Sequence, residues 1–81
     1  MTRDEALTII EKTEADYNEK QRILRGLMIL AKYDDNLDFS FEHDHMWVAD
    51  FEGTVAKMSR DDVVTLASLG WFESYDSWSH F

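Results

Sequence analysis

The segment LDFSFEHDHMWVADF, residues 37–51, decides the fold class of this 81-residue chain. Apolar side chains occupy every second position of its first half, at Leu37, Phe39 and Phe41. This period of two is typical of a β-strand with one buried and one solvated face. Residues 45–51 have the composition of a second strand, and His43-Asp44 between the two can form the turn. The segment therefore predicts an antiparallel β-hairpin.

Before the hairpin, residues 1–33 have a helical pattern. Thr2-Arg3-Asp4-Glu5 has the form of a capping box, so a helix is expected to begin near Arg3. One unbroken helix over this range would measure about 45 Å, whereas a globule of this size is only about 30 Å across. Two solutions stay open. Either the helix is broken or kinked near Thr13, or it projects and packs against a second copy of the chain through Ile23, Leu27 and Leu30.

Beyond the hairpin, Glu52-Gly53 is expected to form a turn, and residues 54–58 to form a short third strand or an irregular connector. Ser59-Arg60-Asp61-Asp62 begins as a capped helix does, and Gly70 stands where a left-handed helix terminator is expected. The aromatic tail, residues 71–81, has the composition of a strand or of a packed irregular segment. We expect a single α+β domain spanning the whole chain, with a core that includes Phe39, Phe41, Trp47, Leu69 and Trp71.

The charge of the chain is distributed unevenly. The sequence has 8 basic and 17 acidic side chains, a net charge of −9. Residues 1–33 contain equal numbers of both signs, so the whole excess lies in residues 34–81. A surface with this imbalance attracts basic partners and repels nucleic acid, whose phosphates are bound mainly by lysine and arginine. We therefore expect a partner with a basic surface and no direct binding of DNA or RNA.

Composition excludes several classes of protein. The chain has no cysteine, so it has neither disulfides nor thiolate metal ligands. Its longest apolar run, residues 27–31, is too short to span a membrane, and its first residues have no apolar signal core. We expect a cytoplasmic protein with no membrane interaction.

Motifs for chemistry are weak in this chain. Glu42-His43-Asp44-His45 suggests a metal site if it forms a strand, because its two imidazoles then share a face, but the side chains diverge if it forms a hairpin tip. A calcium loop fails at its sixth and twelfth positions, which are Phe39 and His45 instead of glycine and glutamate. The sequence contains no phosphate loop, nucleophile elbow or zinc-protease motif. We expect no enzymatic activity and no cofactor, and we leave open whether residues 42–45 bind a metal.

Several short motifs occur together in the second half of the chain. His43-Asp44 precedes a strand, Ser59-Arg60-Asp61-Asp62 begins a helix, and Leu69-Gly70-Trp71-Phe72 follows, with Trp78 further on. This pattern over residues 43–81 resembles small uncharacterised proteins of bacteriophages and mobile elements. The resemblance implies a phage-type origin, and hence the cytoplasm of a host cell, but no catalytic residue. Short acidic proteins of that origin are often inhibitors of host defences such as CRISPR effectors or restriction enzymes.

Charge and resemblance together suggest a non-catalytic inhibitor. Carboxylates arrayed on one surface imitate the phosphate backbone of DNA, and can occupy the basic groove in which another protein holds nucleic acid. Alternatively, the acids only keep a small aromatic-rich protein in solution, or the chain is a structural protein that self-associates through its apolar helix. The residues expected to contact the partner are Asp38, Glu42, Asp44, Asp61, Asp62, Glu73, Tyr75, Asp76 and Trp78.

Overall fold

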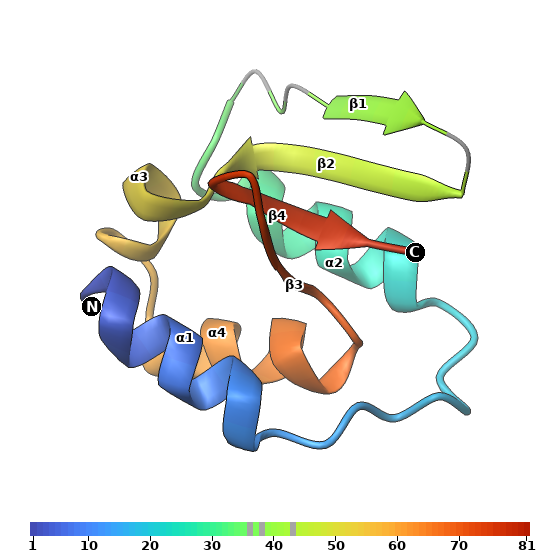
Figure 1. The fold of residues 1–81 in the computed structure, drawn as a ribbon, viewed down its shortest axis with the longest axis horizontal. Helices are drawn as coiled ribbons and strands as arrows, with labels where there is room; N and C mark the ends of the chain where they lie inside the picture. The colour runs from blue at the N-terminus through green and yellow to red at the C-terminus, as the bar shows by residue number, and fades with distance from the viewer. Residues whose placement is uncertain (36, 38, 43) are drawn as a thin grey trace.

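A four-stranded antiparallel sheet with the strand order β1-β2-β4-β3 packs against helices (Figure 1). The structure is a computed structural model that describes residues 1–35, 37, 39–42 and 44–81, with only the backbone of Phe39. The strands are β1 (Phe39–Glu42), β2 (His45–Asp50), β3 (Phe72–Ser74) and β4 (Ser77–His80). The helices are α1 (Arg3–Lys12), α2 (Arg22–Ala31), α3 (Phe51–Val55) and α4 (Arg60–Ser68). The predicted α+β class and the β1–β2 hairpin are confirmed.

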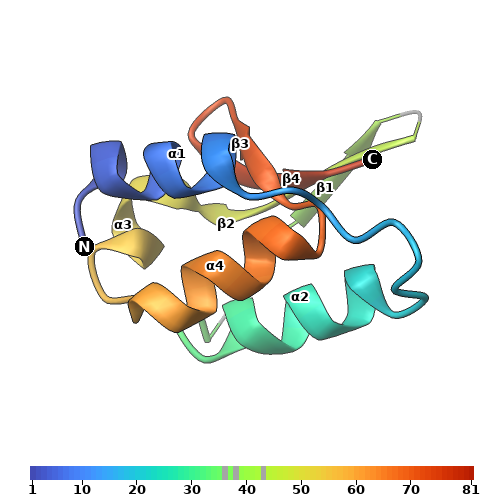
Figure 2. The ribbon, with the colours of Figure 1, turned by 90° about the horizontal axis from the view of Figure 1, so that it is seen from below.

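The helices gather on one side of the sheet, and in Figure 2 they lie in front of the strands. We call the opposite face of the sheet the open face. The covered face is formed by the buried side chains Met46, Val48, Trp78 and His80. The indole nitrogen of Trp78 donates to Oγ1 of Thr54 in α3 at 3.0 Å, and its ring packs on Phe51 with centroids 4.7 Å apart. Since side chains alternate along a strand, Trp47 of β2 and Ser79 of β4 lie on the open face.

The N-terminal pattern forms two helices. The capping box is present, because Thr2 accepts from the amide of Glu5 while the Glu5 carboxylate accepts from the amide of Thr2. The first helix ends at Lys12, so the break expected near Thr13 is confirmed. An unbroken helix of about 45 Å does not fit a molecule that measures 29 × 27 × 21 Å. Among the described residues, no helix is long and apolar enough to cross a membrane.

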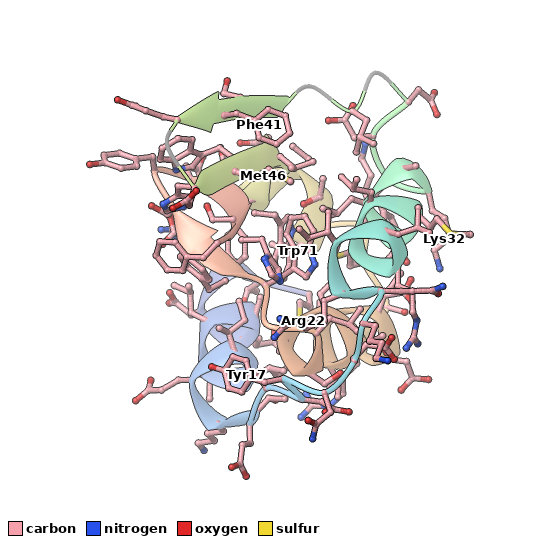
Figure 3. All side chains as sticks on the ribbon, turned by 90° about the vertical axis from the view of Figure 1, so that its right-hand side faces the viewer. Tyr17, Arg22, Lys32, Phe41, Met46 and Trp71 are labelled. Atoms are coloured by element: carbon pink, nitrogen blue, oxygen red, sulfur yellow. The ribbon has the colours of Figure 1, made fainter. Side chains whose placement is uncertain are left out.

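A glycine brings α2 against the centre of the molecule. Figure 3 shows Trp71 between the strands and α2, and its indole nitrogen donates to the carbonyl oxygen of Arg22 at 3.0 Å. A Cβ atom added to Gly26 would lie 2.1 Å from the same nitrogen. Gly26 is therefore required for the close approach of α2 to the fully buried Trp71.

The segment after the hairpin differs from its prediction. Asp50 caps α3 by accepting from the amide of Gly53 at 2.6 Å, so residues 52–53 lie inside a helix and are not a turn. Of the two alternatives for residues 54–58, a third strand is wrong, because residues 54–55 belong to α3, whose Phe51 and Val55 are buried in the core. The irregular connector is present in residues 56–59, between α3 and α4.

The core prediction is confirmed in part. Leu69 and Trp71 are buried as expected. Phe41 is 64% exposed, because β1 lies at the edge of the sheet, so its assignment to the core is wrong. Trp47 is only half-buried and lies on the open face, and the side chain of Phe39 lies outside the described part of the structure.

The C-terminal elements follow their local signals more closely. Ser59 caps α4 by accepting from the amide of Asp62 at 3.2 Å, and Gly70 has the left-handed φ of +88° expected of a helix terminator. The aromatic tail forms the β3–β4 hairpin. This hairpin turns at Tyr75 and Asp76, whose φ angles are +52° and +58°.

Candidate protein-binding surface

Aromatic side chains cluster on the open face of the sheet. The rings of His45 and Trp47 are stacked, with centroids 4.1 Å apart and planes 8° from parallel. Tyr75 meets Trp47 edge-on at 6.2 Å, while Phe72 and Phe81 lie 5.7 Å and 4.6 Å from His45. We call these five residues the aromatic platform. Large rings of this kind supply much of the contact energy at protein interfaces.

The register of the sheet explains why these rings meet. Trp47 pairs with Ser79, and Ser79 pairs with Phe72, so the three side chains form one row across three strands. The small side chain of Ser79 is fully buried in the middle of that row. The rings of the neighbouring strands can therefore close over it.

Carboxylates border the aromatic platform at both ends. A hollow of about 510 Å³ on one side of Trp47 includes Asp50, Tyr75 and Asp76 in its lining. A second hollow of about 400 Å³ on the other side includes Glu42, Asp44 and His45. Among the residues that the structure describes, neither hollow is lined by lysine or arginine. We call the four carboxylates Glu42, Asp44, Asp50 and Asp76 the acidic rim.

The carboxylates of the acidic rim are only partly engaged within the fold. Within the described ranges, Glu42 and Asp44 form no ion pair with a lysine or arginine. Asp50 caps α3 through Oδ2, and Asp76 accepts from Nη1 of Arg3 at 2.9 Å through Oδ1. Among the described residues, the four carboxylates of the acidic rim have one ion-pair partner, the guanidinium of Arg3. The surface around Trp47 therefore has an excess of negative charge, which favours a basic partner.

Two ring nitrogens on the platform are buried without a hydrogen-bond partner. They are Nε2 of His45 and Nε1 of Trp47, and this statement covers the described residues only. Buried polar atoms are nearly always hydrogen-bonded in folded proteins.

The other predicted acids lie elsewhere. Glu73 faces the helical side, where its carboxylate is 3.5 Å from the guanidinium of Arg3. Asp61 and Asp62 lie at the start of α4, on the far side of the molecule from β1 (Figure 1). Asp62 is paired with Nζ of Lys32 at 2.7 Å. The predicted set therefore does not form one array of carboxylates.

Some predicted contact residues require correction. Trp78 is fully buried beneath the sheet, so it is not available to a partner. Tyr75 is 86% exposed, as a contact residue must be. Asp38 lies outside the described residues. The sheet buries Trp78 because the tail forms a strand that pairs with β2, which places this side chain toward α3.

The proposed self-association face is also altered. Leu30 is fully buried in the core and cannot form a dimer contact, whereas Leu27 is half-buried and Ile23 is exposed. Helix α2 instead exposes Leu24 and Met28 in addition to Ile23. Of the three predicted residues only Ile23 is exposed, and it shares the outer surface of α2 with Leu24 and Met28.

The candidate metal cluster at residues 42–45 includes His43, which lies outside the described residues. In the part of the chain that is described, no three histidine, aspartate or glutamate side chains come together as a metal site would require. The ring of His45 is stacked on Trp47 and packs near Phe81. Its position makes it part of the aromatic platform.

The environment of Asp62 makes a prediction about pH. Burial raises the pKa of this carboxyl group, but the hydrogen bonds from Lys32 and Tyr33 outweigh burial and hold the pKa below its ordinary value of 3.8. Since the pKa is lower in the folded state, the stabilisation is complete above the ordinary value and is lost as the pH falls through the folded pKa.

We expect Asp62→Asn to flatten the fall in the free energy of unfolding between about pH 5 and about pH 2, measured by urea denaturation. Asp61→Asn is the matched control, because Asp61 is an exposed neighbour without an ion pair among the described residues. An equal change in both variants would show that the Lys32–Asp62 contact does not contribute.

Sequence reasoning missed five residues of this surface: His45, Trp47, Asp50, Phe72 and Phe81. The alternation of Ser77 and Ser79 with Trp78 and His80 was an available signal for β4. It would have placed the small side chains on one face and the large ones on the other. The remaining residues are brought together by strand pairing over long sequence separations.

Comparisons of the chain with protein-family models, with curated proteins and with solved structures gave no match. The assignment of a function therefore depends on the geometry of the aromatic platform and the acidic rim.

Proposed function

We propose that this protein is a non-catalytic binding protein whose aromatic platform and acidic rim cover a basic surface of another protein. The observation that supports this proposal is the position of Trp47, at the centre of a ring cluster with carboxylate-lined hollows on both sides. Aromatic residues provide contact area, and the surrounding charges select the partner and accelerate its association.

The proposed mechanism is inhibition by occupancy. In a nucleic-acid-handling protein, a basic surface normally binds the phosphates of DNA or RNA. A tightly held acidic protein on the same surface would exclude DNA or RNA without any chemical step. Because the carboxylates do not form one linear array, contact through the aromatic platform contributes to affinity in addition to the imitation of phosphate charge.

The test is affinity capture on the immobilised protein, followed by competition with duplex DNA on the purified captured protein. We expect to capture a nucleic-acid-binding protein that DNA displaces, and capture should weaken between about 50 mM and about 300 mM salt. A captured protein that DNA does not displace would contradict the inhibitory mechanism. Absence of any specific capture at low salt would contradict the proposed function itself.

The acidic rim makes a second prediction. Glu42→Gln combined with Asp44→Asn should weaken partner binding about tenfold, or about 1.4 kcal/mol, at low salt, since both carboxylates line the hollow beside Trp47. The protein should stay folded, because both side chains are exposed. Binding is measured by isothermal titration calorimetry.

The matched control is Glu11→Gln combined with Glu14→Gln, which removes the same charge from exposed positions in and just after α1. It should change the affinity no more than about threefold, because distant charges act only through the screened overall field. Equal losses in the two double variants would mean that net charge, and not the acidic rim, determines binding.

A second candidate function is self-association through α2. The exposed apolar side chains Ile23, Leu24 and Met28 on one short helix favour it. In that case the protein would act as an assembly subunit, and its contacts would tolerate salt because they are apolar.

A further inference from the structure

The 510 Å³ hollow beside Trp47 has an unusual lining for the surface of a small domain. Two aromatic rings, Trp47 and Tyr75, and two carboxylates, Asp50 and Asp76, line the same hollow. We infer that this hollow is an arginine-binding pocket that receives one guanidinium group of the basic partner. The inference rests on the proposed function, since it names the chemical group recognised at the same surface.

The aromatic rings provide the first part of the recognition. Trp47 and Tyr75 contact each other edge-on, with ring centroids 6.2 Å apart and planes 64° apart, so they form adjoining walls of the hollow, and a group in the hollow can lie against both. A planar cation stacks on an indole face through the negative charge of the π-system. The guanidinium is planar and weakly hydrated, so it loses less hydration free energy on leaving water than an ammonium group does.

The carboxylates provide the second part. Oδ2 of Asp50 is held by the amide of Gly53, and Oδ1 of Asp76 is held by Arg3. Each carboxylate therefore has its other oxygen without a partner among the described residues, and both side chains line the hollow. Two separate acceptors match the fork of five donors on the guanidinium of arginine. They match the ammonium group of lysine less well, because that group is a single point charge.

The backbone around the hollow is strained. Non-glycine residues rarely have positive φ angles, and the described residues include four of them. Three of the four line this hollow: Ala49 at +60°, Tyr75 at +52° and Asp76 at +58°. Asn-Gly is the preferred pair in a hairpin turn of this kind. Aspartate tolerates this conformation, but the presence of Tyr75 there indicates that a ring is retained at a cost to stability, as at functional sites.

The test is titration of the full ¹⁵N-labelled chain with the peptide acetyl-Gly-Arg-Gly-amide, followed by NMR. We expect shifts at the Trp47 indole and at the amides of Ala49, Tyr75 and Asp76, with a dissociation constant on the order of 1 mM for a single side chain. The same peptide with citrulline, which is uncharged and nearly isosteric, should bind at least about tenfold more weakly. The lysine peptide should also bind more weakly than the arginine peptide.

The variant Tyr75→Asn should weaken peptide binding without destabilising the fold. Asparagine tolerates the left-handed conformation, so the variant should unfold at an equal or higher temperature, yet bind the arginine peptide at least about tenfold more weakly. Tyr17→Asn is the matched control, because Tyr17 is a 77% exposed tyrosine outside the hollow, and it should leave peptide affinity unchanged. Asp50→Asn keeps a side chain able to cap α3 and should also weaken binding.

The inference is overturned if the citrulline or lysine peptide binds as tightly as the arginine peptide, or if Tyr75→Asn retains full affinity. Its failure differs from failure of the proposed function. A captured partner that still depends on Glu42 and Asp44, with no response of Trp47 to the arginine peptide, would refute the pocket alone. Peptide binding without any basic protein partner would refute the proposed function alone.

Discussion

Gly26→Ala is expected to destabilise the protein by about 2–3 kcal/mol and to lower its Tm by about 10–20 °C. The added methyl carbon would lie 2.1 Å from Nε1 and 2.3 Å from Cε2 of Trp71. The indole cannot move aside easily, because it is buried and hydrogen-bonded to the carbonyl of Arg22. Helix propensity favours alanine by only about 1 kcal/mol, so the steric term dominates.

Thermal and urea unfolding measured by circular dichroism test this expectation. Met28→Ala is the control on the same helix, and should change stability by less than about 0.5 kcal/mol because Met28 is 64% exposed. Trp71→Phe combined with Gly26→Ala should recover part of the loss, since the smaller ring makes room for the methyl group. A Gly26→Ala variant as stable as the original protein would contradict the packing of α2 on Trp71.

Trp47→Ala is expected to weaken partner binding at least about 30-fold, which corresponds to the loss of about 2 kcal/mol typical of a central aromatic contact. Trp47 lines both hollows and stacks on His45, so its removal dismantles the aromatic platform. The fold should survive, because Trp47 is only half-buried on the open face and the main core lies under the other face.

The affinity of Trp47→Ala for the captured partner is measured by calorimetry, with circular dichroism as the check on folding. Met28→Ala is again the matched control, since it truncates an exposed apolar side chain on a different surface. It should change the affinity less than about twofold if the aromatic platform is the interface. A larger loss of affinity for Met28→Ala than for Trp47→Ala would show that the interface lies on α2.

Local signals in the sequence predicted the elements whose structure is determined locally. The capping box at Thr2, the cap at Ser59 and the terminator at Gly70 are all present, because each depends on hydrogen bonds or φ angles within a few residues. The β1–β2 hairpin was predicted for the same reason, since period-2 alternation determines which residues share a face.

The inner face of β2 was not predictable in this way. Both of its faces carry apolar side chains, and the choice of Met46 and Val48 for the core depends on α3, which follows β2 directly, and on β4, which pairs with β2 from a distant part of the chain. A register shift between Val48 and Asp50, with Ala49 at a positive φ, further disturbs simple alternation. Trp47 was therefore assigned to the core although it lies on the open face.

Of the candidate surface, the sequence predicted Glu42, Asp44 and Asp76 of the acidic rim and Tyr75 of the aromatic platform. Excess acid in residues 34–81 indicated a basic partner, but the sequence does not show that Arg3 engages Glu73 and Asp76 across the fold. The β3–β4 hairpin has no glycine or asparagine at its turn, which is why the tail was not resolved into two strands. Without those strands, the meeting of Trp47, Phe72 and Tyr75 had no basis in local sequence.

Hydrogen exchange of the backbone amides, measured for the protein alone and in complex with the captured partner, tests the central claim most directly. If the aromatic platform and acidic rim form the interface, protection should increase in residues 44–50 and 72–77 and stay unchanged in α2. Protection confined to residues 23–28 of α2, with none on the open face of the sheet, would contradict the claim.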